Sequence, residues 1–84
     1  MKIIIEPHTI ERAKERGTNE IEIKDVIENG TPSPAKYERQ GKYKVYDFNS
    51  IWNNKSYTKK KVEVYYVIEN GEVFTVTVLV FYTK

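Results

Sequence analysis

The stretch VEVYYVIENGEVFTVTVLVFY (residues 62–82) constrains the fold of this chain most strongly. Its apolar residues recur with a period of two on both sides of Asn70-Gly71, which is the pattern of two β-strands. Asn-Gly favours the type I′ turn that joins antiparallel strands. The stretch therefore predicts a long β-hairpin in which Glu69 and Glu72 face each other across a two-residue loop.

Both faces of this hairpin are predicted to be apolar. With unbroken alternation, one face carries Tyr65, Val67, Phe74, Val76, Val78 and Val80, and the other carries Val62, Val64, Tyr66, Leu79 and Phe81. Two short helices can cover only one face of such a sheet, so the second face needs a cover. The candidates are the loop around Trp52, a second copy of the chain and a different partner.

Two helices are predicted before the hairpin, after a short apolar strand at the N-terminus (residues 2–5). PHTIERAKER (residues 7–16) has proline in its first turn, and Gly17 follows at the position that ends many helices. In the next segment Asn19 can cap a second helix, with Glu22 completing a capping-box pattern, and Gly30 ends it.

The remaining segments are assigned by turn residues and alternation. TPSP (residues 31–34) is predicted as a loop. KYERQGKYKVYDF (residues 36–48) is predicted as a hairpin that turns at Gln40-Gly41, residues 49–58 as a long connection or irregular strand end, and TKKK (residues 58–61) as a solvated strand entry. The predicted order is β-α-α-β-β-β-β, an α+β fold with two N-terminal helices packed on one face of a mostly antiparallel, twisted sheet.

Composition limits the class of protein. A chain of 84 residues predicts a single domain over residues 1–84. It has no cysteine, and no apolar run approaches the roughly 20 residues of a membrane helix, so we expect a soluble, cytoplasmic protein without a membrane partner. The net charge of only +2 argues against coating nucleic acid by charge alone, so any such site would be local.

Three basic side chains recur on the first predicted helix. His8, Arg12 and Arg16 are four residues apart, and each step of four turns a helix by about 40°, so they share an arc of about 80°. The positive helix N-terminus disfavours the imidazolium and keeps the histidine available as a base. Such a stripe could cut a phosphodiester, with His8 as general acid or base and the arginines holding the phosphate. The alternative is an ion-paired, solvated helix face.

No carboxylates are spaced to join the single histidine at a zinc ion. We therefore expect neither a metal site nor a cofactor.

The predicted hairpin over residues 36–48 supplies a second candidate site. If it turns at Gln40-Gly41, one side of the sheet carries Tyr37, Arg39, Lys42 and Lys44. Three cations and an aromatic ring can hold phosphates and stack a base, as RNA-binding surfaces do. The alternative is a lysine-rich edge strand that resists aggregation.

PHTIERAKERGTNEIEIKDVIENG (residues 7–30) resembles the opening of the small prokaryotic proteins grouped as the domain of unknown function 4258 family. In that family a short strand precedes a His-x-x-x-Arg-x-x-x-Arg helix, a second amphipathic helix and a β-rich remainder. His8, Arg12 and Arg16 match the motif position by position. The family is similar to the RelE/ParE/BrnT toxins of toxin–antitoxin systems, which share a plan of two helices on a sheet.

The resemblance implies a ribonuclease toxin that cleaves mRNA without metal, either free or on the ribosome, and that is held by an antitoxin protein. RelE-type enzymes tend to carry catalytic residues late in the chain, whereas this sequence has no arginine after Arg39, so no late residue is assigned a role. ParE-type relatives act on gyrase, and the shared plan does not select between these targets. The alternative function is a non-catalytic module that binds protein or RNA through its uncovered sheet face.

Overall fold

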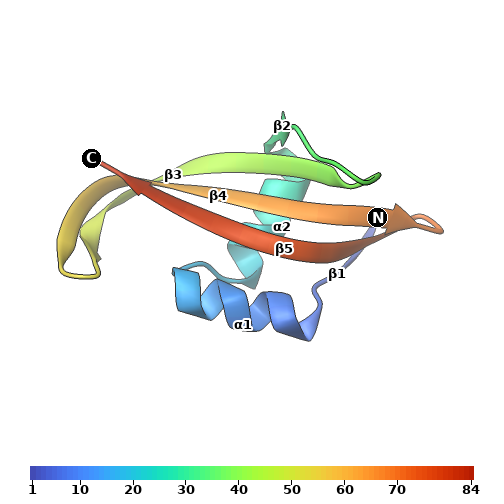
Figure 1. The fold of residues 1–84 in the computed structure, drawn as a ribbon, viewed down its shortest axis with the longest axis horizontal. Helices are drawn as coiled ribbons and strands as arrows, with labels where there is room; N and C mark the ends of the chain where they lie inside the picture. The colour runs from blue at the N-terminus through green and yellow to red at the C-terminus, as the bar shows by residue number, and fades with distance from the viewer.

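The computed structural model describes residues 1–84 as one five-stranded sheet with two helices (Figure 1). The elements are β1 (Lys2–Ile4), α1 (Pro7–Arg16), α2 (Glu20–Asn29), β2 (Thr31–Ser33), β3 (Gln40–Trp52), β4 (Lys55–Glu69) and β5 (Glu72–Thr83). The strands are arranged β1-β5-β4-β3-β2, and only the β1–β5 pair is parallel. The α+β class, with two helices and a mostly antiparallel sheet, is confirmed.

The helices and the last hairpin were predicted correctly from capping and turn residues. Gly17 ends α1 in the left-handed region at φ 88°, and Asn19 caps α2 by accepting a 2.9 Å hydrogen bond from the Glu22 N–H. Asn70 and Gly71 have φ values of 50° and 76°, as a type I′ turn requires. The predicted pairing of Glu69 with Glu72 is also confirmed.

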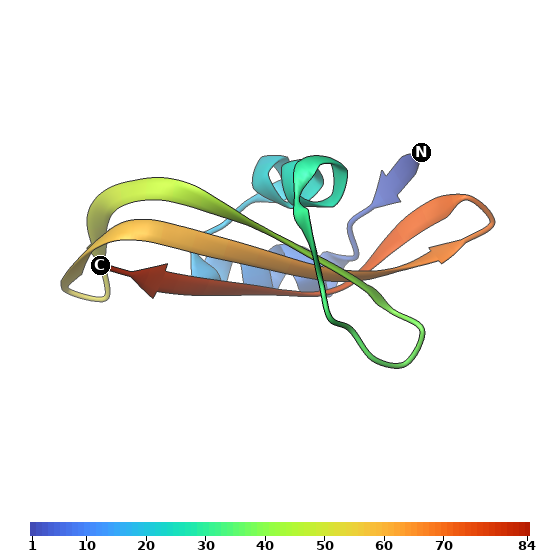
Figure 2. The same ribbon diagram turned by 90° about the horizontal axis from the view of Figure 1, so that it is seen from above.

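The two helices take different positions on the sheet. α2 covers one face over β3 and β4, as predicted, while α1 lies along β5 at the edge of the sheet (Figures 1 and 2). β1 pairs with β5 only at residues 72–74, so the remainder of that edge is available to α1. The buried apolar core joins both helices to the two central strands through Ala13, Ile23, Val26, Ile27, Val62, Val64, Tyr66, Val73 and Val78.

The predicted hairpin at Gln40-Gly41 is wrong. The strand that pairs with the start of β3 is β2 at residues 31–33, the segment predicted as a loop, and residues 34–39 connect the two. Gly41 is buried within β3, where a Cβ atom would lie 2.8 Å from the Tyr65 ring and 2.9 Å from the Ser33 carbonyl oxygen. Its role is close approach between strands rather than a turn.

The predicted division of the last hairpin into faces is also wrong. The β4–β5 register shifts between Tyr65 and Tyr66, because β5 contains one extra residue at Val76. A β-bulge of this kind exchanges the two faces beyond it. Val78 and Val80 therefore lie with Val62 and Val64 on the face that α2 covers.

The β3–β4 hairpin extends past the helices and bends at its end (Figure 1). It closes through Asn53 and Asn54, both at positive φ. Trp52 stacks on Tyr82, with ring centroids 5.1 Å apart, and approaches Gly17 at the end of α1. Trp52 thus packs against the end of α1 and does not cover the second face of the sheet. Neither helix is long and apolar enough to cross a membrane.

Candidate functional site

The His8–Arg16 stripe of α1 lies against the edge of β5. The His8 Nε2 atom is 3.0 Å from the Val76 carbonyl oxygen, and Arg16 Nη1 donates to the Val78 carbonyl oxygen at 2.5 Å. A carbonyl only accepts hydrogen bonds, so the His8 contact requires a proton on Nε2. Both side chains satisfy backbone groups on an edge that no neighbouring strand pairs with beyond residue 74.

Arg12 lies between them and has a different partner. Its Nη1 atom donates to Glu15 at 3.2 Å, and both side chains are more than half exposed. An exposed pair of this kind contributes little to stability. Arg12 is therefore the member of the stripe whose guanidinium is most accessible to a ligand.

The two lysines predicted to bind RNA point towards α2. Lys42 Nζ donates to the Ile27 carbonyl oxygen at 2.8 Å, and Lys44 Nζ donates to Asp25 at 2.6 Å. The Lys44 hydrogen bond, with others from Tyr46 and Asn29, lowers the pKa of Asp25 to about 2. These lysines tether the helix to β3.

The other two residues of the predicted RNA patch lie in the loop between β2 and β3. Tyr37 is 83% exposed, and both Tyr37 and Glu38 adopt positive φ. The loop lies on the side of the sheet opposite α2 (Figure 2). There Tyr37 and Arg39 line a shallow groove of about 350 Å³ together with Tyr65 and Thr77.

The predicted site residues are consequently in three places. The α1 stripe lies beside β5, Lys42 and Lys44 lie beneath α2 on β3, and Tyr37 and Arg39 lie on the opposite side of the sheet. β4 separates β3 from β5 in the strand order. The structure does not bring the helix stripe and the RNA patch into one cleft.

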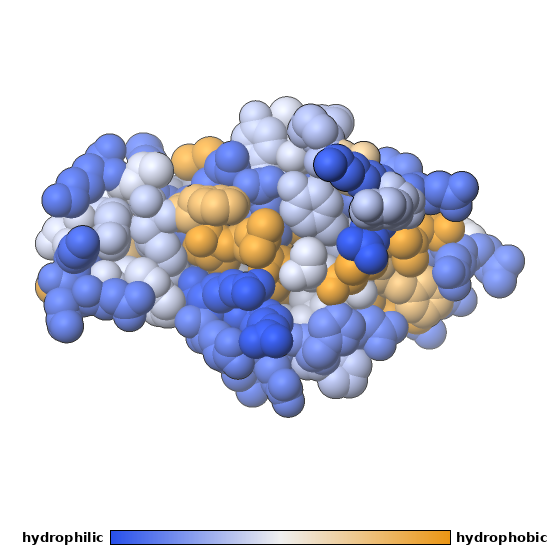
Figure 3. Space-filling model, viewed as in Figure 1, coloured by the Kyte–Doolittle hydropathy of each residue, from blue (hydrophilic) through white to orange (hydrophobic).

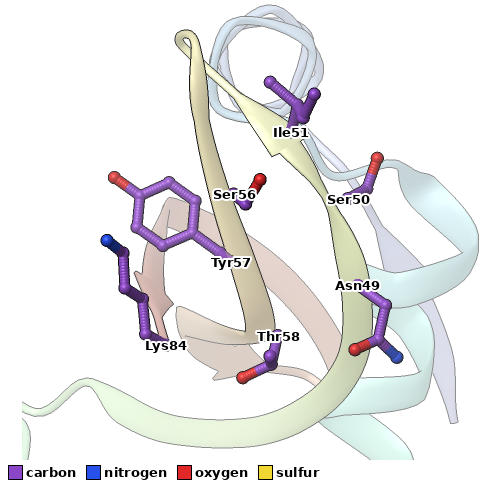
Figure 4. A pocket seen from close by; sticks show the side chains of 7 residues that line it. All are labelled: Asn49, Ser50, Ile51, Ser56, Tyr57, Thr58 and Lys84. Carbon is purple, nitrogen blue, oxygen red and sulfur yellow. The ribbon is translucent and has the colours of Figure 1, made fainter.

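The largest cavity, about 750 Å³, lies in the bend of the β3–β4 hairpin (Figure 4). Its lining consists of Asn49, Ser50, Ile51, Ser56, Tyr57, Thr58 and Lys84. These side chains include no carboxylate or histidine that could activate a hydroxyl group. The size of the cavity therefore does not make it a catalytic site.

The covered face contains a buried ion pair that sequence patterning missed. Lys60, predicted as part of a solvated strand entry, has a side chain only 9% exposed. Its Nζ atom donates to Glu22 at 2.8 Å and to the Gly17 carbonyl oxygen at 3.0 Å. Thr18 also donates to Glu22, at 2.7 Å. This network holds the α1–α2 connection on β4.

No helix covers the face opposite α2, here called the open face, although the loop of residues 34–39 lies on the same side and forms a groove with Tyr65 and Thr77 at one end. Its residues on the three long strands include Tyr43, Val45, Lys61, Glu63, Tyr65, Val67, Phe74, Leu79 and Phe81. Phe81 is 46% exposed and Val45 is 51% exposed. Figure 3 shows this side of the molecule, with apolar surface interrupted by charged side chains. Alternation in the sequence did not predict this set of residues, because the extra residue at Val76 exchanges the two faces of β5.

Charges at the centre of the open face are paired with each other and packed on aromatic rings. Lys61 Nζ is 3.4 Å from a Glu63 oxygen and lies 5.0 Å from the Tyr43 ring centroid and 5.5 Å from that of Phe81. Glu63 also accepts a 2.8 Å hydrogen bond from the Tyr65 hydroxyl. The open face thus has a paired charge cluster at its centre, with exposed apolar groups on the flanking strands.

No three histidine, aspartate or glutamate side chains converge as a metal site would require. Comparison of the chain with protein-family models, with curated proteins and with solved structures found no match.

Proposed function

We propose that this chain is a non-catalytic binding module whose open face binds a protein partner. The observation that carries the proposal is the exposed apolar surface on the face opposite α2, with Phe81 and Val45 about half exposed. Burying such side chains against a partner contributes about 25 cal/mol per Å² of apolar area removed from water. Isolated exposed apolar residues are ordinary, but a set that shares one sheet face marks an interaction surface.

The basic groups support protein rather than RNA as the partner. Lys61 pairs with Glu63, and Lys59 pairs with Asp47 on the same strand pair. An RNA site draws its affinity from cations that are free to neutralise phosphates. The open face offers few of these, the exceptions being Lys36 and Arg39 in the loop beside it.

The competing proposal, suggested by the family resemblance, is a RelE-like toxin that cleaves mRNA through His8, Arg12 and Arg16. Such a toxin needs its acid–base group and its phosphate-holding groups within reach of one phosphodiester. Arg12 is the residue of the stripe best placed to contact RNA, because its only partner is an exposed glutamate.

Metal-free cleavage of a mixed-sequence RNA, with and without ribosomes, separates the two proposals. The binding-module proposal predicts no cleavage by the wild-type protein in either condition. Cleavage that is lost in folded His8→Ala and Arg12→Ala variants would replace it with the toxin proposal.

A photo-crosslinking amino acid placed at position 81 tests the binding surface directly in living cells. Position 68 is a matched control, because Ile68 is 48% exposed but pairs with Val73 outside the open face. We expect a discrete cross-linked protein from position 81 and none from position 68. Equal labelling from both positions, or none from either, would contradict the proposed surface.

A further inference from the structure

The open face has an arrangement of residues that complements itself. Val45, Lys61 and Phe81 form one row across β3, β4 and β5, because Lys61 pairs with each of the other two. The next row consists of Tyr43, Glu63 and Leu79 in the same strand order. Each row has a charge on the central strand and an apolar or aromatic side chain on either flank, and the two charges are opposite.

A twofold axis between these rows would bring complementary groups together. If the axis lies in the plane of the interface and crosses β4 near Val62, each row packs on the other row of the second copy. Lys61, which is 41% exposed, then lies over Glu63 of the second copy, whose side chain is 11% exposed, and Phe81 lies over its Leu79. Reciprocal contacts of this kind define the isologous interface of a C2 dimer.

The size of the open face fits such an interface. The molecule measures 42 × 23 × 21 Å, so one broad face is comparable with the roughly 800 Å² that each partner buries in a standard interface. Two sheets packed face to face lie about 10 Å apart. Side chains as long as lysine, glutamate and phenylalanine span that distance.

From these observations we infer that the open face binds a second copy of this chain, forming a twofold sheet-on-sheet dimer in which Lys61 of each copy pairs with Glu63 of the other. The inference rests on the proposed function and names its partner. The dimer has four layers, with the two sheets inside and the α2 helices outside. It supplies a second core to a chain whose own core contains nine buried apolar residues.

Sedimentation equilibrium of the purified full chain tests the dimer. We expect wild type and the control Ile68→Lys to have twice the 9.9 kDa chain mass. We expect Phe81→Lys to raise the dissociation constant of the dimer at least about thirtyfold, because each dimer contains the substituted position twice. Val45→Lys, on the opposite flank of the same row, provides a second disrupting variant if Phe81→Lys does not fold.

Three results would overturn the inference: a wild-type monomer, a Phe81→Lys or Val45→Lys variant that dimerises normally, or an Ile68→Lys variant that dissociates. A wild-type monomer that still cross-links to a different protein through position 81 would leave the proposed binding function intact. A dimer that contains RNA after nuclease-free purification would instead favour nucleic acid as the occupant.

Discussion

Lys60 and Lys61 are neighbours on β4 but face opposite sides of the sheet, and their environments differ accordingly. Lys60 is buried and donates to Glu22 and to the Gly17 carbonyl, whereas Lys61 lies half-exposed between two aromatic rings. On the covered face, α2 and the α1–α2 connection already supply partners for the lysines. On the open face Glu63 is also buried, beneath Lys61 and Tyr65, whereas Val45 and Phe81 remain about half exposed. The comparison shows that the helices complete the covered face, and the exposed apolar side chains of the other face support the proposal that it binds a partner.

The largest expected difference between the faces is in the stability of the monomer. Lys60→Ala leaves Glu22 without its cationic partner in a site that is 20% exposed, so we expect a loss of about 3–5 kcal/mol in the free energy of unfolding. Lys61→Ala removes a lysine that is 41% exposed and leaves Glu63, which is 11% exposed, with the Tyr65 hydroxyl as a hydrogen-bond donor, so we expect a smaller loss of about 1–3 kcal/mol. Urea denaturation under conditions where both variants are monomeric measures the two values. Equal losses would mean that the two lysines contribute equally to the free energy of unfolding, which would contradict the comparison.

The packed end of α1 and the free tip of the last hairpin provide a second comparison. In Gly17→Ala the new Cβ would overlap the Tyr82 hydroxyl and lie 3.0 Å from Trp52, at φ 88°. We expect a loss of about 2–4 kcal/mol from strain and overpacking.

Gly71→Ala is the matched control, because Gly71 also has positive φ but no atom would lie within 4 Å of its Cβ. It should cost about 1 kcal/mol, from backbone strain alone. Thermal unfolding followed by circular dichroism gives both values. A control as damaging as Gly17→Ala would show that the aromatic contacts at the helix end contribute nothing.

Acid should weaken the contact between α2 and β3 on the covered face. The pKa of Asp25 is lowered from 3.8 to about 2, chiefly by the Lys44 hydrogen bond. A lowered pKa in the folded state means that the stabilisation is present above about pH 4 and is lost as the pH falls towards 2. Asp25→Asn should therefore be less stable at neutral pH and show a flatter acid limb, measured by urea denaturation across this range. An unchanged acid limb would exclude Asp25 as its source.

Local structure was predictable where the signal lies within a few residues. Gly17 ends α1 through its left-handed backbone, and Asn19 begins α2 by capping it with its side chain. Asn70-Gly71 sets its turn through positive φ. The prediction at Gly41 was wrong because the contact that requires a glycine there comes from a residue distant in sequence. The Tyr65 ring lies against Gly41. A glycine required for close approach is indistinguishable from a turn glycine in the sequence.

The candidate site was less predictable because its geometry depends on tertiary pairing. The helix stripe was correctly placed on one face of α1, but its contacts with β5 carbonyls arise because β1 pairs with only three residues of that strand. The open face was concealed by the extra residue at Val76, which moves Val78 and Val80 to the covered side. Alternation alone carries no sign of such a bulge.

The most direct test of association through the open face is to mix two charge-reversed variants. Lys61→Glu places like charges opposite each other in the twofold dimer, and Glu63→Lys does the same. In a mixed dimer both contacts are again between opposite charges. With folding of each variant verified by circular dichroism, we predict that each sediments as a monomer alone and that the equimolar mixture forms a heterodimer. Variants that stay monomeric when mixed, or that dimerise equally well alone, would contradict the twofold pairing of the open faces.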